Sequence, residues 1–139
     1  MNAIPSPEAW YAHRVSYGET DAMQVLYYAE YLHLFERARS HLIREYGMSY
    51  STVEERGLYL PVREASARYR RPIRFDDLVN VHVTVSDWGR ASITFSYEIR
   101  SEDRSVLHAT GMTQHACVNA EGRPVGVPDW LRDLFAQKG

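Results

Sequence analysis

Residues 29–46 read AEYLHLFERARSHLIREY, and this stretch decides the fold. Its large apolar and aromatic side chains recur mainly at intervals of three and four residues, and charged or polar side chains fill the positions between them. An α-helix completes a turn every 3.6 residues, so this spacing gathers the apolar side chains on one face. We predict an amphipathic helix of about five turns that ends at Gly47, because glycine adopts the left-handed C-cap conformation without steric penalty. The apolar set is Tyr31, Leu32, Phe35, Ala38, Leu42 and Tyr46.

After this helix the period of the hydrophobic pattern changes from 3.6 to 2. Apolar and polar residues alternate through residues 64–70, 79–86 and 93–100, and a further strand is expected over residues 105–118. Such alternation is typical of antiparallel strands with one face on the core and the other in water. The segments between these stretches are rich in Pro, Asp, Gly and Ser, which favour turns. The alternating apolar residues are Ala65, Ala67, Tyr69, Val79, Val81, Val83, Val85, Ile93, Phe95, Tyr97 and Ile99.

The remaining segments complete the predicted order of elements. Residues 12–18 alternate over a short span and predict a first strand, and residues 49–57 predict a connector or a short helical turn. A helix of 18 residues is about 27 Å long, which matches the span of an antiparallel sheet wrapped around it. We therefore expect an α+β fold in a single domain over residues 1–139. Residues 129–135 predict a short terminal helix with its apolar side chains facing inward, namely Trp130, Leu131 and Leu134.

The composition narrows the function. The chain has 139 residues, 45% of them hydrophobic, a net charge of −2 and one cysteine, Cys117. A chain of this size forms a core without disulfides, and one cysteine excludes a disulfide framework and any multi-cysteine metal site. No apolar run approaches the roughly 20 residues of a membrane helix, and no signal peptide is evident. Near-neutral charge argues against a dedicated nucleic-acid binder. We expect a cytoplasmic, soluble protein with an inert, buried Cys117 thiol.

Most standard catalytic signatures are absent, and the polar segment before the helix is the strongest candidate for chemistry. The chain has no G-x-S-x-G, no phosphate-binding loop and no H-E-x-x-H, and its six histidines lack metal-ligand spacing. Asp21, however, lies just ahead of a helix N-terminus, where unpaired backbone N–H groups stabilise negative charge. A carboxylate there can attack a carbonyl or activate water. The alternative from the spacing alone is that Thr20 or Asp21 only caps a turn.

The same segment resembles a known family. Residues 17–32, YGETDAMQVLYYAEYL, followed by FERAR at residues 35–39, resemble the signature of hot-dog fold acyl-CoA thioesterases of the hydroxybenzoyl-CoA thioesterase family. The similarity continues in LPV at residues 60–62, in YRRP at residues 69–72 and in RFDD at residues 74–77. It covers nearly the whole chain. The resemblance implies a hot-dog fold, in which a five-stranded antiparallel sheet wraps around a long central helix.

The resemblance also implies roles for particular residues. Asp21 matches the family's catalytic aspartate, which is a nucleophile or a general base toward water on the thioester carbonyl. Tyr28 matches the position that opens the central helix, where the backbone N–H faces the thioester oxygen. Tyr17 matches an aromatic residue that lines the pocket, although a core tyrosine is an equal alternative. Cations near the phosphates of coenzyme A are implied at Arg70, Arg71 and Arg90, and exposed arginines on a wet strand face are the alternative.

One departure and two competing functions remain. Gln24 stands where the family usually has Gly, so it is expected to reshape the loop or the acyl entrance.

The family implies a homodimer, often a tetramer, with no metal or redox cofactor, and an unpaired edge strand argues for pairing on physical grounds. The competitors are an acyl-carrier-protein thioesterase or a non-catalytic acyl-thioester-binding protein, and a hot-dog hydratase. His33 and His41 do not lie at the helix start, where a hydratase would need them, so we rank the hydratase last.

Overall fold

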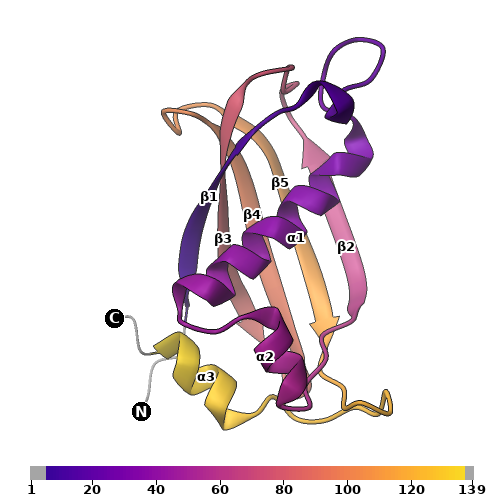
Figure 1. Ribbon diagram of the computed structural model, residues 1–139, viewed down its shortest axis with the longest axis vertical. Helices are drawn as coiled ribbons and strands as arrows, with labels where there is room; N and C mark the ends of the chain where they lie inside the picture. Colours follow the sequence, from indigo (N-terminus) through magenta and orange to yellow (C-terminus); the bar gives the residue numbers. More distant parts are fainter. Residues whose placement is uncertain (1–5, 137–139) are drawn as a thin grey trace.

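The central helix and the sheet lie where the hydrophobic pattern places them. A computed structural model describes residues 6–136, and within them helix α1 (Tyr28–Glu45) crosses the concave face of a five-stranded antiparallel sheet (Figure 1). The strands are β1 (Glu8–Arg14), β2 (Val62–Tyr69), β3 (Leu78–Trp88), β4 (Ser92–Ser101) and β5 (Leu107–Ala116), in the spatial order β1-β3-β4-β5-β2. This confirms the predicted α+β hot-dog architecture. Gly47 follows the helix at φ +96°, as its predicted role as a C-cap requires.

Two short helices cover one end of the molecule. Helix α2 (Tyr50–Glu55) follows the central helix, and α3 (Asp129–Ala136) packs beside the end of α1 (Figure 1). Ser49 caps α2, because its hydroxyl accepts the amide of Thr52 at 3.2 Å. The short helical turn and the terminal helix expected from the sequence are both present, and three α3 side chains are buried: Leu131, Leu134 and Phe135.

Two strand predictions need correction. The first strand was placed at residues 12–18, but β1 spans Glu8–Arg14 and is followed by a 3-10 turn at Tyr17–Glu19. The amide of Val15 still donates to the carbonyl of Asp77, in register with β1 and β3, and the chain then turns at Ser16 into the 3-10 turn. The half-buried pattern predicted for residues 64–70 is also wrong, since β2 is exposed on both faces. It is an edge strand that pairs only with β5, and α1 contacts it at few residues, among them Tyr31 against Tyr69, so most of its side chains stay exposed.

The core lies between α1 and the inner faces of the middle strands. The alternating residues of β3 and β4 are buried there, as predicted. Phe35 stacks on the ring of Tyr97 with ring centroids 4.3 Å apart. It also lies directly over Gly111 of β5, where a Cβ atom would come within 2.3 Å of the Phe35 ring. Glycine at this position therefore lets the helix approach the sheet closely.

A chain of hydrogen bonds runs through this core. Arg39 donates to the hydroxyl of Tyr97 at 3.0 Å, and the Tyr97 and Thr113 hydroxyls are 2.7 Å apart. Nε2 of His115 lies 2.8 Å from the Thr113 hydroxyl, and its Nδ1 lies 2.8 Å from the carbonyl of Leu60. Because a carbonyl only accepts, Nδ1 carries the proton and Nε2 accepts. Burial, together with the charge of Arg39, lowers the pKa of His115 to about 4. The imidazole is therefore neutral in the folded protein at pH 7.

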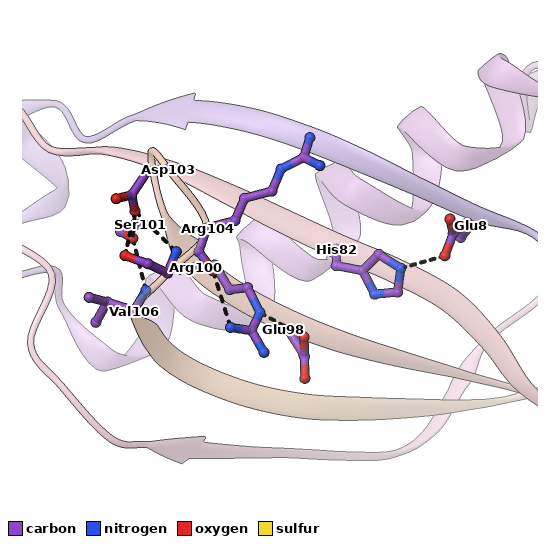
Figure 2. A network of polar contacts seen from close by, with 9 residues as sticks. Glu8, His82, Glu98, Arg100, Ser101, Asp103, Arg104 and Val106 are labelled. Atoms are coloured by element: carbon purple, nitrogen blue, oxygen red, sulfur yellow. Dashed lines mark hydrogen bonds and ion pairs between the residues drawn. The ribbon is translucent and has the colours of Figure 1, made fainter.

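The outer face of the sheet is polar. Nε2 of His82 lies 3.0 Å from the carboxylate of Glu8 on the neighbouring strand, and Arg100 donates to Glu98 at 2.9 Å (Figure 2). Asp103 holds the β4–β5 turn by accepting the hydroxyl of Ser101 at 2.8 Å. Ion pairs that remain partly in water contribute little to folding. The stability of the sheet therefore comes from its inner face.

Gly111→Ala tests the close approach of helix and sheet. The added methyl group collides with the ring of Phe35, so the free energy of unfolding is expected to fall by about 1–3 kcal/mol. Urea unfolding followed by far-UV circular dichroism measures the change. Gly18→Ala is the control, because its Cβ meets no atom within 4 Å. Equal stability of the parent and Gly111→Ala would contradict the packing.

His115 predicts a loss of stability in mild acid. The unfolded imidazole takes up a proton below its ordinary pKa of 6.5, whereas the folded imidazole does so only near pH 4. Lowering the pH from 6.5 to 4 therefore favours the unfolded state, by up to about 3 kcal/mol. Urea unfolding at several pH values measures the slope. His115→Asn should flatten it, because asparagine does not titrate, while its amide can still donate to Leu60. The same slope in both proteins would show that other groups cause it.

Candidate active site

The loop ahead of α1 is held against the segment that follows β2. Thr20 and Leu26 form an isolated antiparallel bridge, and the amide of Asp21 donates to the carbonyl of Val25 at 3.0 Å. The amide of Leu26 then donates to the carbonyl of Ile73 at 2.7 Å. These bonds place the loop beside the chain that leaves β2. Residues far apart in the sequence therefore meet at the N-terminal end of α1 (Figure 1).

Gln24, which stands where the family usually has Gly, has a backbone conformation that favours glycine. Its φ is +63°, in the left-handed region that glycine adopts most readily. Its amide donates to the carbonyl of Asp21 at 2.9 Å, and its carbonyl accepts the amide of Phe75 at 3.2 Å. Glutamine therefore accommodates the turn with its backbone paired on both sides.

The carboxylate of Asp21 has one oxygen engaged and one available. Its Oδ1 accepts the amide of Met23 at 2.8 Å and that of Val25 at 3.4 Å. No donor within residues 6–136 bonds Oδ2. The turn-capping role weighed from the sequence is thus real, and it fixes the carboxylate while leaving the second oxygen for chemistry.

The N-terminus of α1 is uncapped beside this carboxylate. The helix begins at Tyr28, and the N-cap residue Tyr27 provides no side-chain acceptor. In the described part of the chain, the Tyr28 amide has no hydrogen-bond acceptor. An unpaired amide at the positive end of a helix dipole stabilises a developing negative charge.

A cavity of about 300 Å³ brings four of the predicted site residues together. Asp21 and Tyr28 line it from the loop and the helix start, and Arg70 and Arg71 line it from the end of β2. The rest of the lining is apolar or aromatic: Leu26, Tyr31, Tyr69 and Pro72. A carboxylate, an open helix end and two cations thus surround one small, partly apolar space.

Two tyrosines of this cavity were not predicted as site residues. Tyr31 is only 4% exposed, and its ring meets the ring of Tyr69 edge-on at 4.7 Å. Burial, together with the charges of Tyr69 and Asp21, raises the pKa of Tyr31 to about 12. The Tyr69 hydroxyl donates to the carbonyl of Tyr28 at 3.4 Å. The sequence did hold one indication that Tyr31 belongs to the site: it follows Tyr28 by three residues and therefore shares its helix face.

Two predicted site residues lie outside this cavity. Tyr17 is 70% exposed, and its ring packs edge-on against Phe75 at 5.7 Å. Arg90 lies in the β3–β4 turn, at the opposite end of the sheet. Ser92, two residues on, pairs with Ala116, and the Ala116 amide donates to the carbonyl of Pro61, just before β2 begins. One copy of the chain therefore does not bring Arg90 near Asp21.

Other chemistries find little support in the described residues. Among residues 6–136 no group of three His, Cys, Asp or Glu side chains is placed to hold a metal ion. Cys117 is buried, and burial raises the pKa of its thiol to about 11, so it is an inert core residue as predicted. No helix in this part of the chain is long and apolar enough to cross a membrane.

Comparison with known proteins shows the family of the chain. Residues 15–135 match the model of the thioesterase-like superfamily. The chain is 34% identical over 124 residues to the acyl-CoA thioesterase YbgC of Haemophilus influenzae. The alignment covers 88% of this chain and 90% of the relative.

Two solved structures share the fold. A hypothetical protein from Aquifex aeolicus superimposes with a TM-score of 0.85 at 31% identity, covering 91% of this chain and 98% of that one. The DHNA-CoA thioesterase from Staphylococcus aureus superimposes with a TM-score of 0.84 at 29% identity, and the match covers 94% of this chain and 89% of that one. The chain belongs to the thioesterase-like superfamily, and it is a homologue of hot-dog fold acyl-CoA thioesterases, as the sequence predicted.

Proposed function

We propose that this protein hydrolyses acyl-CoA thioesters to a free carboxylic acid and coenzyme A in the cavity around Asp21. The observation that supports this most strongly is that a carboxylate with a free oxygen and an uncapped helix N-terminus line the same cavity. The carboxylate serves the attack on the thioester carbonyl carbon, directly or through water, and the helix end stabilises the carbonyl oxygen.

The two groups divide the reaction between them. Asp21 either attacks the thioester carbonyl, which expels the coenzyme A thiolate and leaves an acyl anhydride for water to hydrolyse, or it removes a proton from the attacking water. In both routes the carbonyl oxygen becomes negative. The Tyr28 amide and the dipole of α1 stabilise that oxygen, because they are fixed in place before the reaction begins.

Coenzyme A, rather than a carrier protein, is the proposed thiol. Arg70 and Arg71 line the cavity, and guanidinium groups bind phosphates through paired hydrogen bonds. Two of the similar proteins are named for CoA thioesters. Tight binding of an acyl-CoA without hydrolysis would instead favour the non-catalytic alternative.

The exposed β2 edge is proposed to pair with a second copy of the chain. Val62 and Tyr69 of this strand are each 51% exposed, and Leu32 of α1 beside it is 43% exposed. An uncovered edge strand with apolar neighbours invites strand pairing. Two-fold symmetry would run the two β2 strands antiparallel, so the end with Asp21 meets the end where the second copy's β2 begins. Arg90 of the second copy then lies beside the cavity and joins Arg70 and Arg71.

Asp21→Asn is expected to fold like the parent and to lose at least about 10²-fold in kcat. Asparagine retains the Oδ1 acceptor for the Met23 amide, so the turn survives while the charge is lost. Thiol release from a panel of acyl-CoA esters measures turnover, and circular dichroism checks the fold. Asp87→Asn, at an exposed position of β3, is the control. Parent-like turnover by Asp21→Asn would disprove the role of this carboxylate.

A mixed dimer tests whether Arg90 serves the other copy. Arg90→Ala alone is expected to lower kcat/KM about tenfold, because a charged contact to phosphate is lost. Co-refolding of Arg90→Ala with Asp21→Asn gives mixed dimers in which one of the two sites has both native residues. The mixture should therefore exceed the activity of either variant alone. If Arg90 acts within its own chain, mixing restores nothing.

A further inference from the structure

Glu19 and His13 form a nearly buried pair behind the candidate site. Nε2 of His13 lies 2.9 Å from Oε1 and 3.1 Å from Oε2 of Glu19, so its N–H donates to both oxygens. The two side chains are only 11% and 13% exposed. Glu19 Oε1 also accepts the amide of Ser16 at 2.7 Å. Burial opposes ionisation of Glu19, but the Ser16 amide and His13 outweigh it and hold the pKa of the carboxyl below its ordinary value.

The backbone of Glu19 contacts the start of α1. Its carbonyl accepts the amide of Tyr27, the N-cap residue of that helix, at 2.9 Å. The side chain of Glu19 is therefore bound to β1 through His13, and its main chain is bound to the helix start through Tyr27. Asp21 follows Glu19 by two residues, and Tyr28 follows Tyr27 directly. Both groups that the proposed reaction uses thus lie within two residues of this connection.

We infer that the His13–Glu19 pair is a positioning pair, which fixes the carboxylate of Asp21 relative to the Tyr28 amide. This inference rests on the proposed function. His13 belongs to a paired strand and does not move with the loop, so it holds Glu19 in place. Glu19 then holds the loop and the helix end together. Neither side chain lines the cavity, so the pair acts through Asp21 and Tyr28 and not on the substrate.

The pair is suited to this role because it is both polar and shielded. Removing one partner leaves the other polar group without compensation in a largely shielded position, so the loop shifts to solvate it. Catalysis is sensitive to such shifts, since a displacement of about 1 Å can cost about 10²-fold in rate. Much of the loss should appear in kcat, because Arg70 and Arg71 still line the cavity from another segment.

The experiment compares Glu19→Ala with a matched pair elsewhere in the sheet. His82 and Glu8 form the same kind of contact at 3.0 Å on the outer face (Figure 2), and His82→Ala removes it without touching the loop. Glu19→Ala is expected to lower kcat by about 10²-fold with KM changed less than threefold. It should also raise backbone hydrogen–deuterium exchange over residues 20–28. His82→Ala should change neither quantity.

Two further variants separate positioning from general stability. Glu19→Gln retains an oxygen that accepts from His13 and Ser16, so it should restore most of the kcat lost in Glu19→Ala. His13→Ala should resemble Glu19→Ala, and the double variant should be no worse than either single variant, since both changes break one contact.

The outcomes overturn the inference in distinct ways. Parent-like exchange over residues 20–28 in Glu19→Ala would show that the pair does not hold the loop. Raised exchange with unchanged kcat would show that the held geometry does not matter for catalysis, and additive effects in the double variant would show that the two residues act separately. If the parent itself releases no thiol from any acyl-CoA, the proposed function fails, while the exchange comparison still tests the loop.

Discussion

The contact between Phe35 and Gly111 is the constraint on which the rest of the structure depends. The ring lies where a Cβ atom of residue 111 would be, and it stacks on Tyr97 of the neighbouring strand. This brings α1 close to the sheet and fixes its position across the concave face. Because a helix is stiff, fixing its middle also fixes its first turn. The unpaired amide of Tyr28 therefore has a defined place relative to the loop and to the end of β2.

The polar groups inside this core are arranged so that their hydrogen-bonding capacity is largely used. Arg39, Tyr97, Thr113 and His115 form one chain of donors and acceptors that ends on the carbonyl of Leu60. Such a network favours one packing of the helix over alternatives, because a shift would leave several buried polar groups without partners. The position of the helix start at the candidate site thus depends on hydrogen bonds in the core, away from Asp21.

The same arrangement leaves most of β2 exposed, and this links the fold to the proposed assembly. The strand lies at the edge of the sheet, and its side chains are largely exposed even though Tyr69 meets Tyr31 of α1. An exposed edge is a liability for a lone chain and a surface for a second copy. In the proposed dimer, Arg90 of the other chain lies beside the cavity and adds a cation to Arg70 and Arg71.

The amino-acid sequence by itself determined the elements and the type of chemistry. The spacing in residues 29–46 defined the long helix, the alternation from residue 79 onward defined the central strands, and the residues around Asp21 indicated a carboxylate at a helix start. These features are local, because hydrophobic periodicity and helix ends depend on neighbouring residues. Tertiary structure alone decided the rest. It decided that β2 is an edge strand, that Arg90 lies far from Asp21 within one chain, and that Tyr31, Tyr69, Arg70 and Arg71 share its cavity. Those facts follow from contacts between distant segments, and neither periodicity nor propensity specifies which distant segments meet.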